Sequence, residues 1–289
     1  MPRKLLIFIL SLLSVALVRA QGVGLVLSGG GAKGLYHIGV LQALEENNVA
    51  IDYVAGTSMG SIIAGLYAAG YTPEQMKEIA ESGAIQQWVS GRIDKKHNRY
   101  YREEDTPPSL FTLRFNVSKR DSTDYNQQLA PEGSNGRTIE LPTDFISSAQ
   151  IDLALNEIFR PATEGAKEDF NCVAADMNTR KEVVFRNGDL GEAIRASMSI
   201  PFVFKPLRKD DMLLYDGGVF NNFPWRYMRK FYHPDHIIGV KCTTGNKEVT
   251  ENSSVIDQAM MFILTHTDYA LPGRGYRIID RAVDGGMLV

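Results

Sequence analysis

The apolar positions along the chain switch repeatedly between two spacings, one typical of buried strands and one typical of helices. A continuous apolar run covers Val23 to Ser28, and the segment after it has apolar residues three positions apart at Leu35, Ile38, Leu41 and Leu44. Further short runs predict strands at residues 53–55, 171–175, 212–215, 237–242 and 276–279. Strands that alternate with helices favour a mainly parallel sheet. We therefore predict one large α/β domain.

The alternation breaks over residues 90–143, which are mostly polar. One segment there, Phe111 to Val117, alternates strictly between apolar and polar side chains, which predicts a half-buried strand. Two interpretations of the region stay open. It is either a surface insertion, since loops tolerate growth, or a cap insertion over an apolar substrate pocket.

A Gly-Thr-Ser-Met-Gly pentapeptide, Gly56 to Gly60, lies between the predicted strand at 53–55 and a helix-like run at 61–69. This is the G-x-S-x-G pattern in the strand, turn and helix context that a nucleophile elbow needs. Such a turn strains the serine backbone, and small neighbours let the chain pass closely. The following helix directs its first amides, including that of Met59, toward a developing oxyanion. The pattern predicts Ser58 as a nucleophile.

A serine hydroxyl needs a neighbouring base, and none of the five histidines lies in a suitable pattern. His37 falls in the first predicted helix and His97 in a charged stretch, while His233 and His236 fall in a predicted helix-to-strand loop. His266 comes late enough in the chain for a triad histidine, but its surroundings are typical of a helix and not of a loop.

An aspartate offers another interpretation. The predicted strand at 212–215 ends in Asp216-Gly217-Gly218, which suits a carboxylate held at the rim of an α/β sheet. The two glycines would keep the backbone tight, so that the Asp216 carboxylate could approach Ser58. An ordinary Asp-Gly turn has the same pattern, and the residues alone leave both interpretations open.

Three consecutive glycines, Gly29 to Gly31, follow the first predicted strand, and Gly34 lies three residues further on. Bare backbone amides at a strand-to-helix junction form an anion site. The run also matches the G-x-G-x-x-G of dinucleotide-binding folds, which need an acidic residue at the end of the second strand, whereas Asp52 begins one. We therefore interpret Gly29, Gly30 and Gly31 as an oxyanion loop, with Lys33 adding a positive field.

The glycine-rich loop, the elbow serine and the strand-end Asp-Gly-Gly, in this order, resemble the patatin-like phospholipase family. The resemblance covers nearly all of the chain from Gly22, and Arg195 to Pro201 also look like a family stretch that borders the site. It implies a three-layer α/β/α sandwich and a Ser-Asp dyad, with Ser58 as nucleophile and Asp216 as proton acceptor. This chemistry requires no metal and no cofactor. The remaining glycines of the motifs are Gly34, Gly56, Gly60, Gly217 and Gly218.

The first twenty residues have the three parts of a secretory signal peptide: the positive pair Arg3-Lys4, an apolar stretch from Leu5 to Val18, and small-residue cleavage after Ala20. We expect residues 1–20 to be removed, leaving a domain of residues 21–289 in the periplasm, at the outer membrane or outside the cell. Removal takes three cations from a formal net charge of −3, leaving −6. An acidic chain argues against a nucleic-acid partner.

Cys172 and Cys242 both fall in apolar strand patterns, so we expect two buried thiols and not a disulfide. The resemblance has one further implication for the end of the chain. Some exported bacterial members of the family continue into a membrane β-barrel, so a C-terminal outer-membrane barrel could be missing here.

Two classes of function follow from these patterns. The first is a lipid acyl hydrolase of the phospholipase A or lysophospholipase type, which cleaves carboxylic esters at a membrane surface. Within the enzyme class, a carboxylesterase or thioesterase acting on small acyl substrates is the alternative. The second class is a non-catalytic exported module, and the three intact motifs favour an enzyme over it.

Overall fold

The computed structural model describes residues 22–85, 88, 116–119, 137–140, 148–160, 169–242, 267, 269–271 and 276–280. The predicted signal peptide lies outside this part of the chain, as does most of the predicted strand at 111–117. Where the two overlap, β3 (Asn116–Lys119) pairs antiparallel with β4 (Arg137–Glu140) in a two-stranded sheet. Whether residues 90–143 form a cap therefore stays a prediction.

The main sheet is mixed but mainly parallel, as the sequence predicts. Five strands run parallel in the order β10-β9-β1-β2-β5: β1 (Val23–Leu27), β2 (Tyr53–Thr57), β5 (Phe170–Asp176), β9 (His236–Lys241) and β10 (Tyr276–Asp280). Three more strands are antiparallel to their neighbours: β6 (Lys181–Phe185), β7 (Leu207–Lys209) and β8 (Met212–Asp216). The predicted helix-to-strand loop is also present, between α8 (Trp225–Tyr232) and β9.

Strand β5 is where the direction of the sheet changes. Its residues Cys172 and Val173 pair with both β2 and β6, so these two strands lie on opposite edges of β5. The next residues of β5 pair with β6 and with β8, which places β8 on the same edge as β2, beyond its end. Strands β2 and β8 therefore meet end to end, with Thr57 opposite Val173 and Asp216 opposite Ala174.

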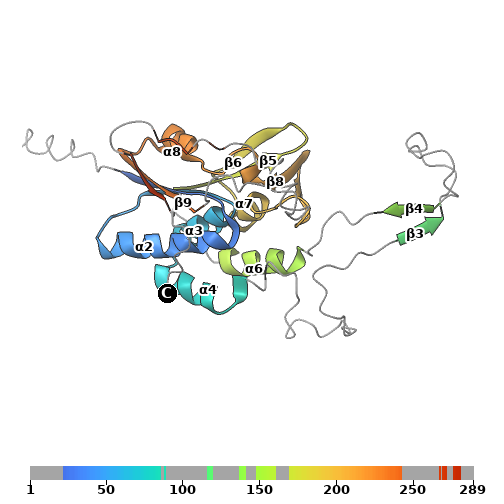
Figure 1. The fold of residues 1–289 in the computed structure, drawn as a ribbon, viewed down its shortest axis with the longest axis horizontal. Helices are drawn as coiled ribbons and strands as arrows, with labels where there is room; N and C mark the ends of the chain where they lie inside the picture. The colour runs from blue at the N-terminus through green and yellow to red at the C-terminus, as the bar shows by residue number, and fades with distance from the viewer. Residues whose placement is uncertain are drawn as a thin grey trace, which may run out of the picture.

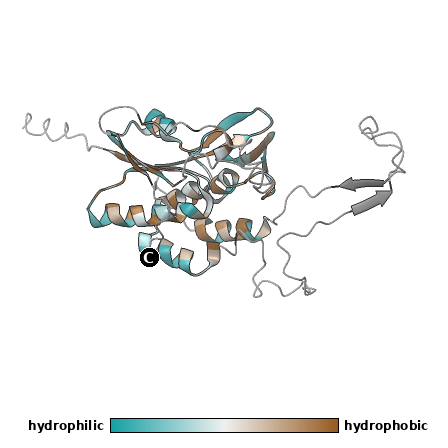
Figure 2. Ribbon diagram, viewed as in Figure 1, coloured by the Kyte–Doolittle hydropathy of each residue, from teal (hydrophilic) through white to brown (hydrophobic). Residues whose placement is uncertain are grey.

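Helices cover both faces of the main sheet (Figure 1). On one face lies α8, where Trp225 and Met228 pack with Val26 of β1. The other face carries α2 (Tyr36–Glu46), α3 (Met59–Ala68), α4 (Pro73–Glu81), α6 (Ala149–Phe159) and α7 (Leu190–Ser197), whose core includes Leu25 and Leu27. Side chains alternate across a strand, so β1 supplies both cores. Hydrophobic positions accordingly dominate the central parallel strands, whereas α2 alternates between hydrophobic and hydrophilic positions (Figure 2).

Local signals explain where two of the helices begin. Helix α4 starts with a capping box. The Thr72 hydroxyl accepts a hydrogen bond from the Gln75 backbone N–H, and the Gln75 side-chain oxygen accepts one from the Thr72 backbone N–H. Helix α2 starts at Tyr36, within one residue of the first predicted apolar position, after a short 3₁₀ helix over Gly31–Leu35. Gly31 has a φ of 56°, outside the right-handed helical region, so an α-helix cannot begin there.

Both cysteines are free thiols and both are buried. Within the described ranges, the structure contains no helix that is long and apolar enough to cross a membrane.

Candidate active site

Ser58 occupies the sharp turn between β2 and α3 and has φ 54° and ψ −125°. A non-glycine residue at positive φ is strained by about 1–3 kcal/mol and persists only where its surroundings enforce it. Here the two flanking glycines allow the turn. A Cβ on Gly56 would lie 2.3 Å from the Gly60 carbonyl oxygen, and one on Gly60 would lie 2.4 Å from the Leu27 oxygen. The chain therefore has the backbone geometry of an elbow at Ser58.

Ser197 also holds the elbow, a role that sequence reasoning missed. Its hydroxyl accepts from the Ser58 amide at 3.0 Å and donates to the Val173 carbonyl at 2.6 Å. Ser197 lies in the stretch 195–201 that resembles the family, which was the available signal. The same stretch also contacts Asp216, because the Asp216 amide donates to the Ser199 carbonyl at 2.8 Å.

Asp216 ends β8 and is brought to Ser58 by the end-to-end arrangement of β2 and β8. Its carboxylate accepts a hydrogen bond from the Gly218 amide at 2.7 Å, and the Ser58 side chain is close enough to the carboxylate to lower its pKa. The close approach needs the glycine after it, because a Cβ on Gly217 would lie 2.1 Å from the Val173 oxygen. The structure thus brings together the serine and the aspartate, the two dyad residues of the prediction.

The electrostatics of this pair favour proton transfer. Asp216 is only 5% exposed and Ser58 only 7%. Burial raises the pKa of Asp216 to about 6, although the hydrogen bonds from Ser58 and Gly218 oppose that rise. A carboxylate with a raised pKa is a stronger base and still ionised at neutral pH.

The described histidines do not provide a base. His233 and His236 lie where β9 begins, whereas Ser58 follows the end of β2, at the opposite end of these parallel strands. His37 is buried and its Nε2 donates to the Ser28 carbonyl at 2.8 Å, while burial lowers the pKa of its ring to about 4. His97 and His266 lie outside the described residues.

The glycine loop passes directly beside the serine. A Cβ on Gly29 would lie 3.0 Å from the Ser58 Cβ, and Gly31 lines the same pocket as Ser58. Of the three glycines of the predicted oxyanion loop, Gly29 is not a free donor, because its amide donates to the Asn222 carbonyl at 3.2 Å. Gly30, Gly31 and Met59 remain the candidate oxyanion donors. Gly34 fits closely under the elbow, since a Cβ there would lie 2.3 Å from the Met59 side chain.

The residue that a dinucleotide fold would need is placed elsewhere. The Asp52 carboxylate accepts from the Val23 amide at 2.8 Å, at the start of β1 and β2. The glycine loop follows the end of β1, so Asp52 lies at the wrong edge of the sheet for a ribose bound there. No group of three or more His, Cys, Asp or Glu side chains that could hold a metal ion occurs among the described residues.

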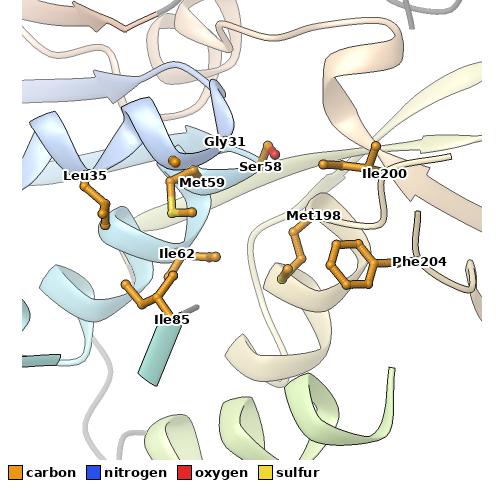
Figure 3. Close-up of a pocket in the computed structure, with 10 residues that line it drawn as sticks. Gly31, Leu35, Ser58, Met59, Ile62, Ile85, Met198, Ile200 and Phe204 are labelled. Carbon is orange, nitrogen blue, oxygen red and sulfur yellow. The ribbon is translucent and has the colours of Figure 1, made fainter. Parts of the chain in front are cut away.

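An apolar pocket of about 170 Å³ opens beside Ser58. Met198 and Phe204 lie opposite Ile62 and Ile85, and Ser58 lies at one end (Figure 3). The other lining residues are Gly31, Ala32, Leu35, Met59 and Ile200. The arrangement is chemically suited to hold a short apolar chain with its carbonyl at the serine.

The fold and the site together define a mainly parallel α/β protein with a strained elbow serine, a buried aspartate beside it and an apolar pocket. The family model for patatin-like phospholipases matches residues 25–229. The chain belongs to the patatin-like phospholipase family.

Relatives in this family come from distant organisms. The chain is 30% identical over 229 residues to the patatin-like phospholipase domain-containing protein ZK370.4 of Caenorhabditis elegans, covering 78% of this chain and 13% of that protein. It is 27% identical over 221 residues to lysophospholipase NTE1 of Candida albicans, covering 76% of this chain and 13% of that protein. An NTE family protein of Mycobacterium tuberculosis is 29% identical over 211 residues, covering 73% of this chain and 29% of that protein. The chain thus spans less than a third of the length of these relatives.

Among solved structures, VipD from Legionella pneumophila is similar with a TM-score of 0.40 and 16% identity, covering 83% of this chain and 52% of that chain. ExoU of Pseudomonas aeruginosa, solved in complex with SpcU, has a TM-score of 0.37 and 17% identity, covering 83% and 47%.

Proposed function

We propose that this chain is a serine lipid acyl hydrolase that cleaves carboxylic esters with Ser58 as nucleophile and Asp216 as proton acceptor. The observation that carries the proposal is a strained elbow serine that interacts with a buried carboxylate at the end of an apolar pocket. Membership of the patatin-like phospholipase family supports the same reaction class. A non-catalytic module would have no use for a strained serine or a buried carboxylate.

In the first half of the reaction, the Ser58 oxygen attacks the ester carbonyl carbon while its proton passes to Asp216. The carbonyl oxygen becomes an oxyanion, which the amides of Gly30, Gly31 and Met59 stabilise. As the tetrahedral intermediate collapses, Asp216 returns the proton to the leaving alcohol oxygen. The acyl group is then bonded to Ser58, and the alcohol departs.

In the second half, Asp216 takes a proton from a water molecule, which attacks the acyl carbon. Collapse of this second intermediate returns the proton to the Ser58 oxygen and releases a fatty acid. Burial of Asp216 serves both halves, because its raised pKa lets it accept and return a proton near neutral pH.

The apolar pocket favours an acyl chain over a polar substrate. A cavity of about 150 Å³ with Leu, Ile and Phe walls binds a molecule the size of benzene, so the pocket beside Ser58 accommodates about six to eight carbons.

We further propose that residues 1–20 direct export. The N-terminal sequence of the secreted protein, expected to begin at Gln21, tests this proposal.

Ser58→Ala tests the nucleophile. We expect hydrolysis of a nitrophenyl hexanoate ester and of a lysophospholipid to fall at least about a thousandfold, while the melting temperature stays close to that of the wild type. A fluorophosphonate probe should label the wild-type protein at Ser58 only, as peptide mass spectrometry would show. An active alanine variant, or labelling at another residue, would refute the assignment.

A further inference from the structure

Side chains hold the two carbonyl groups just before the candidate oxyanion donors. The Ser28 carbonyl accepts from His37 Nε2 at 2.8 Å. The Gly29 carbonyl accepts from Asn222 Nδ2 at 3.2 Å and also contacts the Cys242 thiol at 3.5 Å. Neither carbonyl oxygen is therefore free to turn toward the serine.

Asn222 forms hydrogen bonds with both the backbone amide and the backbone carbonyl of Gly29. Its own carbonyl accepts from the Gly29 amide at 3.2 Å, while its side-chain amide donates to the Gly29 carbonyl. The packing is close, because a Cβ on Gly29 would lie 2.3 Å from the Asn222 Oδ1. The asparagine is fixed in turn by the Thr267 hydroxyl, which accepts from its backbone amide at 3.1 Å, and by the Tyr269 hydroxyl, 2.9 Å from Nδ2.

The hydrogen bond to the Gly29 carbonyl also affects the orientation of the Gly30 amide. In a trans peptide the C=O of one residue and the N–H of the following residue point in opposite directions within one plane. A hydrogen bond that fixes the Gly29 carbonyl therefore also fixes the Gly30 N–H, directed away from Asn222. A Cβ on Gly29 would lie 2.3 Å from the Asn222 Oδ1 and 3.0 Å from the Ser58 Cβ, so the fixed peptide runs beside the nucleophile.

We infer that Asn222 is a positioning residue for the oxyanion hole: by holding the Gly29 carbonyl it aims the Gly30 amide at the carbonyl oxygen of the substrate. The inference rests on the proposed function and deepens it, because it assigns the preorganisation of one donor to a named side chain. Preorganised donors stabilise developing charge without reorganisation during the reaction. Loss of Asn222 should therefore reduce turnover more than substrate binding.

The neighbouring Asn221 provides a matched control. Its Nδ2 donates to the Glu182 carboxylate at 2.9 Å and not to the glycine loop. We expect Asn222→Ala to lower kcat about ten- to a hundredfold with KM within about twofold, because one donor is misdirected and substrate binding is unaffected. Asn221→Ala should keep kcat close to wild type at a comparable change in melting temperature. Asn222→Asp keeps the side-chain shape but removes the donor, and it should match Asn222→Ala.

A double-mutant cycle separates positioning from a general loss of structure. In a Gly30→Ala background the amide is already displaced, so adding Asn222→Ala should lower kcat by less than about threefold more. Losses that multiply fully, or an Asn222→Asp variant with wild-type kcat, would overturn the inference. A wild-type protein without esterase activity or fluorophosphonate labelling would instead overturn the proposed function itself.

Discussion

At the scale of single residues, burial acts on two titratable side chains of the site region, Asp216 and His37. It raises the pKa of Asp216 to about 6 and lowers that of His37 to about 4, because in both cases the charged form is disfavoured. The carboxyl group is then neutral at mildly acid pH, and the imidazole stays neutral there. The two shifts make separate predictions for activity and for stability.

Activity should follow the ionisation of Asp216. The base must be deprotonated, so kcat/KM should be constant above the pKa of about 6 and fall about tenfold for each pH unit below it. A pH profile of nitrophenyl ester hydrolysis measures this. Asp216→Asn should be inactive by several orders of magnitude over the whole range, and a profile centred near 7 that a histidine substitution abolishes would contradict the dyad.

Stability should contain two opposing contributions over nearly the same pH range. Asp216 has a raised folded pKa, so its contribution is present at low pH and lost as pH rises from 3.8 through about 6. His37 has a lowered folded pKa, so its contribution is present above 6.5 and lost as pH falls through about 4. At about 1.4 kcal/mol per pKa unit, the contribution is at most about 3 kcal/mol for Asp216 and about 3.5 kcal/mol for His37.

The two contributions should largely cancel in the wild type and separate in variants. Between pH 4 and 6 the free energy of unfolding of Asp216→Asn should rise with pH relative to the wild type. In His37→Asn it should fall with pH relative to the wild type. Denaturant titrations at several pH values measure both slopes, and parallel curves for all three proteins would contradict these predictions.

At the scale of elements, the pocket is built where α3 faces the segment after α7, with Ile62 on one wall and Phe204 on the other. Both side chains are almost fully buried. The facing walls set the space that is left for an acyl chain. Changes on either wall should therefore alter chain-length preference without moving the dyad.

Phe204→Leu should shift the preferred nitrophenyl ester toward longer acyl chains, and Ile62→Phe toward shorter ones. Overpacking of this kind costs about 1–3 kcal/mol in stability, so melting temperatures should be measured alongside kcat/KM from C2 to C12 esters. Phe159→Leu is the matched control, because Phe159 is equally buried in the same core but does not line the pocket. An unchanged profile in both pocket variants would show that the acyl chain binds elsewhere.

Local sequence signals predicted the elements well but not how the strands pair. Apolar runs located β1, β2, β8 and β9, and the capping box located α4, because these depend on neighbouring residues. The antiparallel β8, which brings Asp216 to Ser58, could not be read from its own residues. The roles of Ser197 and Asn222 were missed for the same reason, since their partners lie 139 and 193 positions away.

At the scale of the whole molecule, the site depends on residues from nearly the full length of the described chain. The glycine loop follows the first strand, the elbow follows the second, and the asparagine that holds the loop lies between β8 and α8. The sheet is the common frame, since each of these segments leaves it at a strand end. Helices on both faces keep that frame rigid, so the site can be strained without the fold being lost.

Because β2 and β8 meet along β5, the order of synthesis determines when Ser58 and Asp216 can come together. Ser58 is made early, but β8 emerges from the ribosome only after residues 212–216 have been joined. Until then Ser58 has no Asp216 beside it, and Ser197, which binds the Ser58 amide, is itself among the residues made shortly before β8. A growing chain therefore cannot bring Ser58 and Asp216 together before strand β8 has been made.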